Sequence, residues 1–173
     1  VEKGGEIIPK IVGVERKDNK EESRPIKFIE NCPICNARLV KEEGEAAHYC
    51  PNYNHCPPQI LGRFQHFVSK KAMNIDSLGE ERIKILFSSG LIKDFSSFYT
   101  LKQEDIIGLG SFDKENKANI QAKGANNIIQ AINKSKEVDF TKVLYALGIR
   151  YVGEVTAKRL ATTFKNIDSL IKA

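Results

Sequence analysis

Four cysteines lie close together in a chain of 173 residues, and this clustering limits the fold more than any other feature. Their pattern is C-x2-C, then fourteen residues, then C-x5-C. Two short turns that each present two thiolates are the usual way to build a tetrahedral Zn2+ site, although the second turn, CPNYNHC, exceeds the usual spacer of about two to four residues. Four thiolates leave no coordination position open for water or substrate. We therefore predict a structural Zn2+ site with the ligands Cys32, Cys35, Cys50 and Cys56.

The same cysteines have a second interpretation, as two disulfides or as unconnected thiols. Disulfides need an oxidising compartment, and residues 1–20 lack the charged, apolar and small-residue segments of a secretory signal. His48 and His55 stand beside ligands but are not needed as ligands, because the cysteine set is complete. A cysteine-rich segment of this size does not fold without its metal, so we expect the ion to stabilise the structure and to have no catalytic role.

The rest of the chain changes from strand-like to helical patterns. Residues 1–14 alternate apolar and polar around a GG turn and predict two short strands, with Pro9 favouring a sheet edge or barrel rim. Residues 15–31 are charged and irregular, which indicates a linker. Residues 36–49 predict a short hairpin that turns at Gly44. Helices are predicted at 59–72, 79–89, 95–98, 102–107, 117–133, 139–147, 153–164 and 166–172, with starts marked at 76–77, Asp139 and Gly153.

Composition narrows the function classes. A hydrophobic content of 41% excludes wholesale disorder, and its Ile and Leu predict aliphatic cores. No stretch reaches the roughly 18 to 20 apolar residues that cross a bilayer, so no membrane partner is expected. The formal net charge of +5 favours a polyanionic partner without identifying one.

A weak internal repeat relates residues 72–92 to residues 145–164. Both follow the skeleton apolar-x-x-apolar-Gly-x-x-x-apolar-x-x-Leu, which is typical of a helix–hairpin–helix. A glycine that opens a helix lets other molecules approach free backbone N–H groups and the positive end of the helix dipole. Such an end binds phosphate oxygens without reading bases. In the second copy the predicted DNA contacts are Gly148, Arg150, Gly153, Lys158 and Arg159.

The first copy is a weaker candidate for phosphate binding. Gly79 opens its helix, and Ser77 stands where a first loop glycine would help. Glu80 and Glu81 follow, and acids in a first turn satisfy the dipole themselves and repel phosphate. Lys70 and Lys71, just before this copy, are further candidate phosphate contacts. For either copy a purely structural turn between two helices is the alternative.

Several strings together carry a family resemblance. GGEIIP (4–9), the cysteine spacing, CPPQILGRFQHFVSKKAMNIDSLG (56–79) and YALGIRYVGEVTAKRLA (145–161) resemble consecutive parts of bacterial NAD-dependent DNA ligases. The resemblance implies a mainly α fold with small β parts. It implies three segments: the end of an OB-fold with a linker at 1–30, a four-cysteine zinc finger at 31–58, and an incomplete helix–hairpin–helix domain at 59–173.

The resemblance also implies a function. The family seals nicks by joining a 3′-hydroxyl to a 5′-phosphate through adenylated intermediates, with NAD and Mg2+. No Lys-x-Asp-Gly string is present, and the nearest, RKDN at 16–19, lacks the glycine, so the lysine nucleophile is absent and no catalytic residue is assigned. We expect a fragment, starting in mid-strand at Val1, that is inactive alone and holds nicked duplex DNA by phosphate and minor-groove contacts. A monomer in the bacterial cytoplasm, on the nucleoid, is implied.

Some features depart from the family or stay open. Residues 108–129 resemble another hairpin, but an insertion through DKENKANI precedes its helix, and Gln121 stands where a glycine is expected. His66, between two phenylalanines, is expected to be a core residue without a catalytic role. Two other functions remain: a zinc-ribbon module that docks protein, and a different helix–hairpin–helix repair protein such as an excision nuclease.

Overall fold

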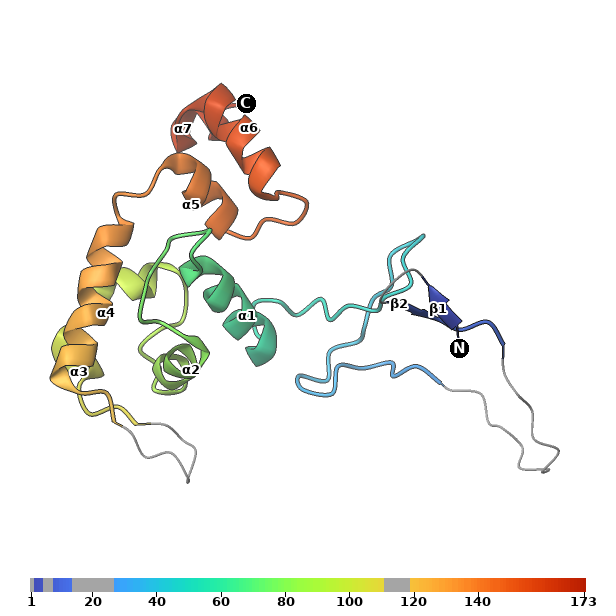
Figure 1. Ribbon diagram of the computed structural model, residues 1–173, viewed down its shortest axis with the longest axis horizontal. Coiled ribbons are helices and arrows are strands. Elements are labelled where there is room, and N and C mark those ends of the chain that lie inside the picture. Colours follow the sequence, from blue (N-terminus) through green and yellow to red (C-terminus); the bar gives the residue numbers. More distant parts are fainter. Residues whose placement is uncertain (1, 5–7, 14–26, 111–118) are drawn as a thin grey trace. The chain divides into compact units, whose positions relative to one another are not determined.

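The computed structural model describes residues 2–4, 8–13, 27–110 and 119–173 of the chain (Figure 1). The chain divides into two compact units, residues 1–30 and residues 31–173. In the first unit β1 (Glu2–Gly4) and β2 (Ile8–Lys10) pair antiparallel, with Gly4 opposite Ile8. The two predicted strands are therefore confirmed, and the described residues form no barrel. The turn between the strands and most of the predicted linker lie outside the described residues.

The second unit begins with the cysteine-rich segment. Val40 and Tyr49 form an antiparallel bridge and exchange backbone hydrogen bonds of 2.8 and 2.7 Å. Gly44 turns the chain between them with a φ of +82°, a conformation that glycine adopts without steric cost. This bridge confirms the predicted hairpin between the two cysteine pairs.

Helices fill the rest of the second unit, and each predicted segment has a helical counterpart. α1 starts two residues earlier than predicted, because Pro57 and Pro58 fit the first turn of a helix, where no amide hydrogen is needed. The predicted start at 76–77 is wrong, since Gly79 precedes the first residue of α2. The observed elements are α1 (Pro57–Val68), α2 (Glu80–Ser88), the 3-10 helix η1 (Ser96–Thr100), α3 (Gln103–Ile106), α4 (Ala122–Ser135), α5 (Phe140–Ala146), α6 (Glu154–Phe164) and α7 (Ile167–Ile171).

The core of the helical part has an aromatic centre. Phe64 of α1 meets Phe98 of η1 edge to face, with ring centroids 5.3 Å apart. Phe67 stacks on Phe95 at 4.5 Å. Buried aliphatic side chains such as Ile83 surround them, so the predicted aliphatic core is only part of the core. Each phenylalanine buries more apolar surface than an isoleucine, and a few of them outweigh their share of the composition.

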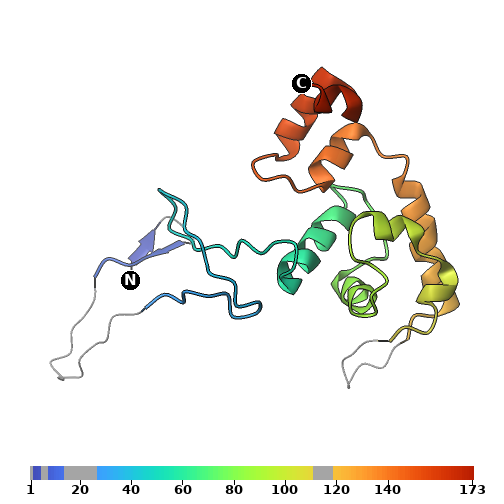
Figure 2. The ribbon, with the colours of Figure 1, turned by 180° about the vertical axis from the view of Figure 1, so that it is seen from behind.

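The last helices form a hairpin array at the end of the chain. α5 packs against α6 and against α1, and α7 packs against α6 (Figures 1 and 2). α1 thus connects the cysteine-rich segment, which it follows directly, to the loop between α5 and α6. None of the described helices has the length and apolar character needed to cross a membrane.

Candidate metal centre and nucleic-acid interface

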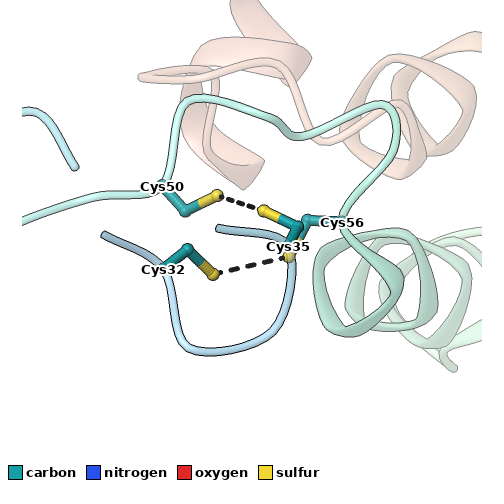
Figure 3. A group of neighbouring side chains, drawn as sticks. All are labelled: Cys32, Cys35, Cys50 and Cys56. Atoms are coloured by element: carbon teal, nitrogen blue, oxygen red, sulfur yellow. Dashed lines mark hydrogen bonds between the residues drawn. The ribbon is translucent and has the colours of Figure 1, made fainter. Parts of the chain in front are cut away.

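The four cysteine side chains converge on one point between the two short turns. Their Sγ atoms all lie within 4.8 Å of one another, and no disulfide joins them. The Sγ atoms of Cys32 and Cys56 are 3.9 Å apart, and those of Cys35 and Cys50 are 3.5 Å apart (Figure 3). The alternative of two disulfides is therefore wrong for this structure.

Local backbone hydrogen bonds shape each turn. In the first turn the Asn36 amide donates to the Cys32 carbonyl at 2.9 Å, and Asn36 adopts a left-handed φ of 57°, which asparagine tolerates. In the second turn the Cys56 amide donates to the Asn52 carbonyl at 2.8 Å. The Gln59 side chain, from the first turn of α1, donates to the Cys50 carbonyl at 3.0 Å. The longer second turn is thereby held as closely as the first.

The sulfur arrangement fits Zn2+. Zinc–sulfur bonds of about 2.3 Å in a tetrahedron put the sulfurs roughly 3.8 Å apart, close to the distances observed. Without metal, burial raises the pKa of Cys56 to about 12 and also raises the pKa of Cys50. The Ala37 amide, by contrast, lowers the pKa of Cys35 to about 6. A dication supplies the charge that buried thiolates need, and the bound Zn2+ has a structural role.

Two loops of the helical domain share one backbone conformation. We call residues 74–79 the N-terminal hairpin and residues 148–153 the C-terminal hairpin. The first residue of each is left-handed, with φ of 52° at Asn74 and 63° at Gly148. The fourth residue is left-handed too, with φ of 67° at Ser77 and 66° at Tyr151. The sequence repeat is thus a structural repeat, but Asn74, and not Ser77, takes the place of the first glycine.

Each hairpin ends in a glycine that opens a helix. Gly153 precedes α6 with φ −79° and ψ −179°, and Gly79 precedes α2 with φ −74° and ψ 174°. No side chain caps either helix, and both glycines are exposed. A Cβ atom at either position would meet nothing within 4 Å. Because these φ values suit any residue, the missing side chain matters for access to the helix end from outside.

Gly148 is required for two local reasons. Its φ of +63° disfavours other residues, and an added Cβ atom would lie 3.4 Å from Cδ2 of His66. The Nε2 atom of His66 donates to the Tyr145 carbonyl at 2.7 Å, and the two rings meet edge to face at 4.7 Å. His66 is half-buried and fastens α1 to the start of the C-terminal hairpin, in agreement with the expected structural role.

The cationic side chains predicted to contact DNA differ in whether they already form ion pairs within the protein. Lys158 and Arg159 are exposed on α6, and Lys70 is exposed before the N-terminal hairpin. Within the part of the chain that the structure describes, these three side chains form no ion pair. Lys71 instead lies 3.2 Å from Glu154, the first residue of α6, which raises the pKa of the lysine. A phosphate would have to compete with Glu154 for Lys71.

Arg150 does not have the free guanidinium that the sequence predicts. It donates to the carboxylates of Glu42 and, at 3.5 Å, of Glu45, both from the cysteine-rich segment. Its guanidinium carbon also lies 5.4 Å from the ring centroid of Tyr49 and 5.0 Å from that of Tyr151. Sequence reasoning missed this cluster because an ion pair between residues about a hundred positions apart has no local sequence signal.

The remaining helix starts are less suited to phosphate. At α2, Glu80 and Glu81 hold Lys84, with N–O distances of 2.7 and 3.5 Å. At α4, Gln121 precedes the helix without a side-chain cap, and the Gly108 amide donates to the Ile120 carbonyl at 2.9 Å. The insertion between Gly108 and Ile120 lies largely outside the described residues.

Comparisons with known proteins agree with this architecture. Residues 31–57 match the NAD-dependent DNA ligase C4 zinc finger domain, and residues 142–173 match the helix-hairpin-helix motif. The whole chain is 48% identical to a DNA ligase of Christiangramia forsetii, 49% identical to that of Flavobacterium johnsoniae, and 51% identical to that of Phocaeicola vulgatus. Each alignment covers 100% of this chain and 25% of the relative. The chain spans about a quarter of the length of the curated relatives it matches.

Proposed function

We propose that this chain, which carries the C4 zinc finger and helix–hairpin–helix segments of an NAD-dependent DNA ligase, holds duplex DNA around a single-strand nick. In the whole enzyme the 3′-hydroxyl and 5′-phosphate of the nick are joined through adenylated intermediates. The nucleophilic lysine, NAD and Mg2+ belong to other parts of that enzyme. This segment alone binds DNA and does not ligate.

The proposal rests on the exposed start of α6, which no side chain caps. Gly153 leaves the helix end exposed and without a side-chain cap. The first turn of α6 carries one acid, Glu154, which pairs with Lys71, whereas the first turn of α2 carries two acids. Free N–H groups and the helix dipole at the start of α6 therefore attract a phosphate oxygen more strongly than those of α2. Lys158 and Arg159 add positive charge on the same helix. These groups recognise backbone phosphates and the width of the minor groove, so the grip is independent of sequence.

The same groups make up the proposed contact set. Gly148 and Gly153 shape and open the C-terminal hairpin, while Lys158 and Arg159 contact phosphates directly. Gly79 with Lys70 and Lys71 forms a second, weaker contact region. Arg150 is held by Glu42 and Glu45 of the cysteine-rich segment and is left out of the direct phosphate contacts. We propose a monomer that acts on the nucleoid in the bacterial cytoplasm, and we assign residues 1–30 to the end of an OB-fold.

The two rival functions have less support. A protein-docking zinc ribbon accounts for the metal centre but not for two hairpins that share an open helix start. An excision nuclease accounts for the hairpins but not for the similarity of residues 31–57 to a ligase zinc finger.

Binding measurements test the grip. The chain should shift nicked and intact duplex DNA in a gel and should bind a tRNA more weakly. The slope of log affinity against log salt should be about −0.9 for each phosphate contacted by a cation. We expect about three or four such contacts, because Arg150 is held by Glu42 and Glu45. Binding without a salt slope would reject a phosphate grip, and equal binding of tRNA would favour a less specific basic surface.

A second experiment tests whether DNA binding by this segment contributes to ligation by the whole enzyme. In a full-length ligase that contains this segment, Gly153→Val should slow nick sealing and leave self-adenylation by NAD unchanged. A loss of self-adenylation would contradict a role limited to DNA binding.

A further inference from the structure

We infer that Arg150 is a positioning residue that fastens the C-terminal hairpin to the zinc finger, so that zinc binding orders the hairpin. This inference can be tested by hydrogen exchange without DNA, and only the DNA-binding experiment at the end rests on the proposed function. The contacts come from both partners. Arg150 and Tyr151 reach from the hairpin, and both contact the Glu42 carboxylate, Tyr151 through its hydroxyl at 3.4 Å. The cluster therefore joins segments about a hundred residues apart in the sequence.

The charges of the cluster show that Arg150 acts indirectly. One guanidinium faces two carboxylates, and the hydrogen bond with Glu42 together with the negative charge of Glu45 raises the pKa of Arg150. The cluster carries a net charge of about −1, and a negative cluster repels a phosphate. The guanidinium also lies near two tyrosine rings, an environment that suits an arginine held in place.

The hairpin needs such a support. Tyr151 holds a left-handed φ of 66°, which is unfavourable for a residue with a Cβ atom, and the residue is 77% exposed. Within the hairpin, the Val152 amide donates to the Ile149 carbonyl at 2.9 Å. Packing contributes little at an exposed loop tip, so the contacts of Tyr151 and Arg150 with the zinc finger stabilise this conformation.

The link to zinc follows from the position of the acids. Glu42 and Glu45 lie on the loop closed by the bridge between Val40 and Tyr49, and Tyr49 immediately precedes the ligand Cys50. A zinc finger without metal loses its fold. Loss of zinc then releases the acids that hold Arg150, and the hairpin loses its support.

Hydrogen exchange tests the coupling without DNA. In the wild-type chain, chelation of zinc should speed exchange of the Val152 amide by about tenfold or more. In Arg150→Ala the amide should already exchange fast, and chelation should change it by less than about twofold. The amides of Asn74 and Ile75 in the N-terminal hairpin serve as the internal control.

A charge exchange shows whether the ion pair itself is responsible. The double variant Arg150→Glu with Glu42→Arg keeps one cation between two carboxylates, and it should restore slow, zinc-dependent exchange at Val152. Both single variants should lose it. If zinc removal leaves Val152 protected in the wild-type chain, or if the double variant rescues nothing, the inference is wrong.

The DNA arm uses a matched pair of variants. Glu42→Gln and Glu43→Gln remove the same charge from adjacent positions, but Glu43 is exposed and forms no ion pair within the described part of the chain. Glu42→Gln should bind nicked duplex about threefold more weakly than Glu43→Gln, in the range of exposed ion pairs. Tighter binding by Glu42→Gln would mean that the acids only mask Arg150, which overturns the inference. Absence of DNA binding by every form, with the exchange results intact, would reject the proposed function alone.

Discussion

The two hairpins share one backbone conformation, but an isoleucine that is buried in one loop is exposed in the other. At the second loop position, Ile75 of the N-terminal hairpin is 3% exposed, whereas Ile149 of the C-terminal hairpin is 49% exposed. At the third position an aspartate, Asp76, corresponds to Arg150. The N-terminal hairpin packs its loop into the core of its own domain, while the C-terminal hairpin presents its loop outward. A helix–hairpin–helix backbone therefore does not by itself make a binding site, and the side chains around it decide.

The helices that follow the hairpins differ in the same direction. Six residues after the opening glycine, α2 has the buried Ile85 where α6 has the exposed Arg159. Five residues after it, Lys84 of α2 is neutralised by two glutamates, while the corresponding Lys158 is exposed. These differences favour the proposed phosphate site at the C-terminal hairpin over the weaker contact region proposed at the N-terminal hairpin.

Removal of zinc should have the largest effect, and it should affect the C-terminal hairpin much more than the N-terminal hairpin. Zinc binding supplies much of the folding free energy of small zinc fingers, about 10 to 16 kcal/mol in peptides, so chelation or Cys56→Ala should unfold residues 31–56. DNA affinity should fall by more than about tenfold, because the C-terminal hairpin loses its support. Circular dichroism should show that most of the helix content remains. A full loss of helix would show instead that the zinc finger holds the entire domain together.

The pH dependence of zinc affinity should also be large. In the metal-free protein the raised pKa values of Cys50 and Cys56 keep both thiols protonated at neutral pH, and zinc must displace these protons. Lowering the pH from 8 to 7 should therefore weaken zinc binding by about a hundredfold or more. Below about pH 6 Cys35 also takes up a proton, and the dependence should steepen. A competition titration with a chelator measures this, and a flat profile would contradict the assignment of buried thiol ligands.

Matched substitutions at the opening glycines sharpen the comparison directly. Gly153→Val should weaken binding of nicked duplex by roughly tenfold, the size expected for a lost charge-assisted hydrogen bond. Gly79→Val should weaken it by about twofold or less. Valine is an equally poor helix cap at both sites, and neither site has a neighbour within 4 Å, so the cost to folding is matched.

The controls for this pair are zinc content and circular dichroism, which should stay unchanged in both variants. Equal losses of affinity would show that the two hairpins contribute equally to DNA binding. Unchanged affinity in Gly153→Val with an intact fold would remove the main support for the proposed grip.

The smallest expected difference concerns the two equivalent lysines. Lys158→Ala should reduce the salt slope of DNA binding by about 0.9, the value for one phosphate contact. Lys84→Ala should leave the slope unchanged, since Lys84 is held by Glu80 at 2.7 Å. Affinity measured at four or five salt concentrations gives both slopes. A reduced slope in Lys84→Ala would show that α2 also contacts a phosphate, despite the ion pairs of Lys84.

Local patterns predicted most of the fold and the metal site. Cysteine spacing reflects ligand geometry directly, and glycines mark turns and helix starts because few other residues fit there. Contacts across long sequence separations were not predictable in this way. The pairing of Arg150 with Glu42, the hydrogen bond from His66 to Tyr145, and the pair of Lys71 with Glu154 depend on how the elements pack, which no local pattern encodes.

A titration of the isotopically labelled chain with nicked duplex DNA, followed by the backbone amide signals, tests the central claim most directly. The amides of the first turn of α6, residues 154–156, should shift strongly and saturate with the binding curve, because the proposed phosphate site lies at these N–H groups. The amides of residues 80–82 at the start of α2 should shift much less. If DNA binds while the signals of residues 154–156 stay in place, the start of α6 is not the phosphate site.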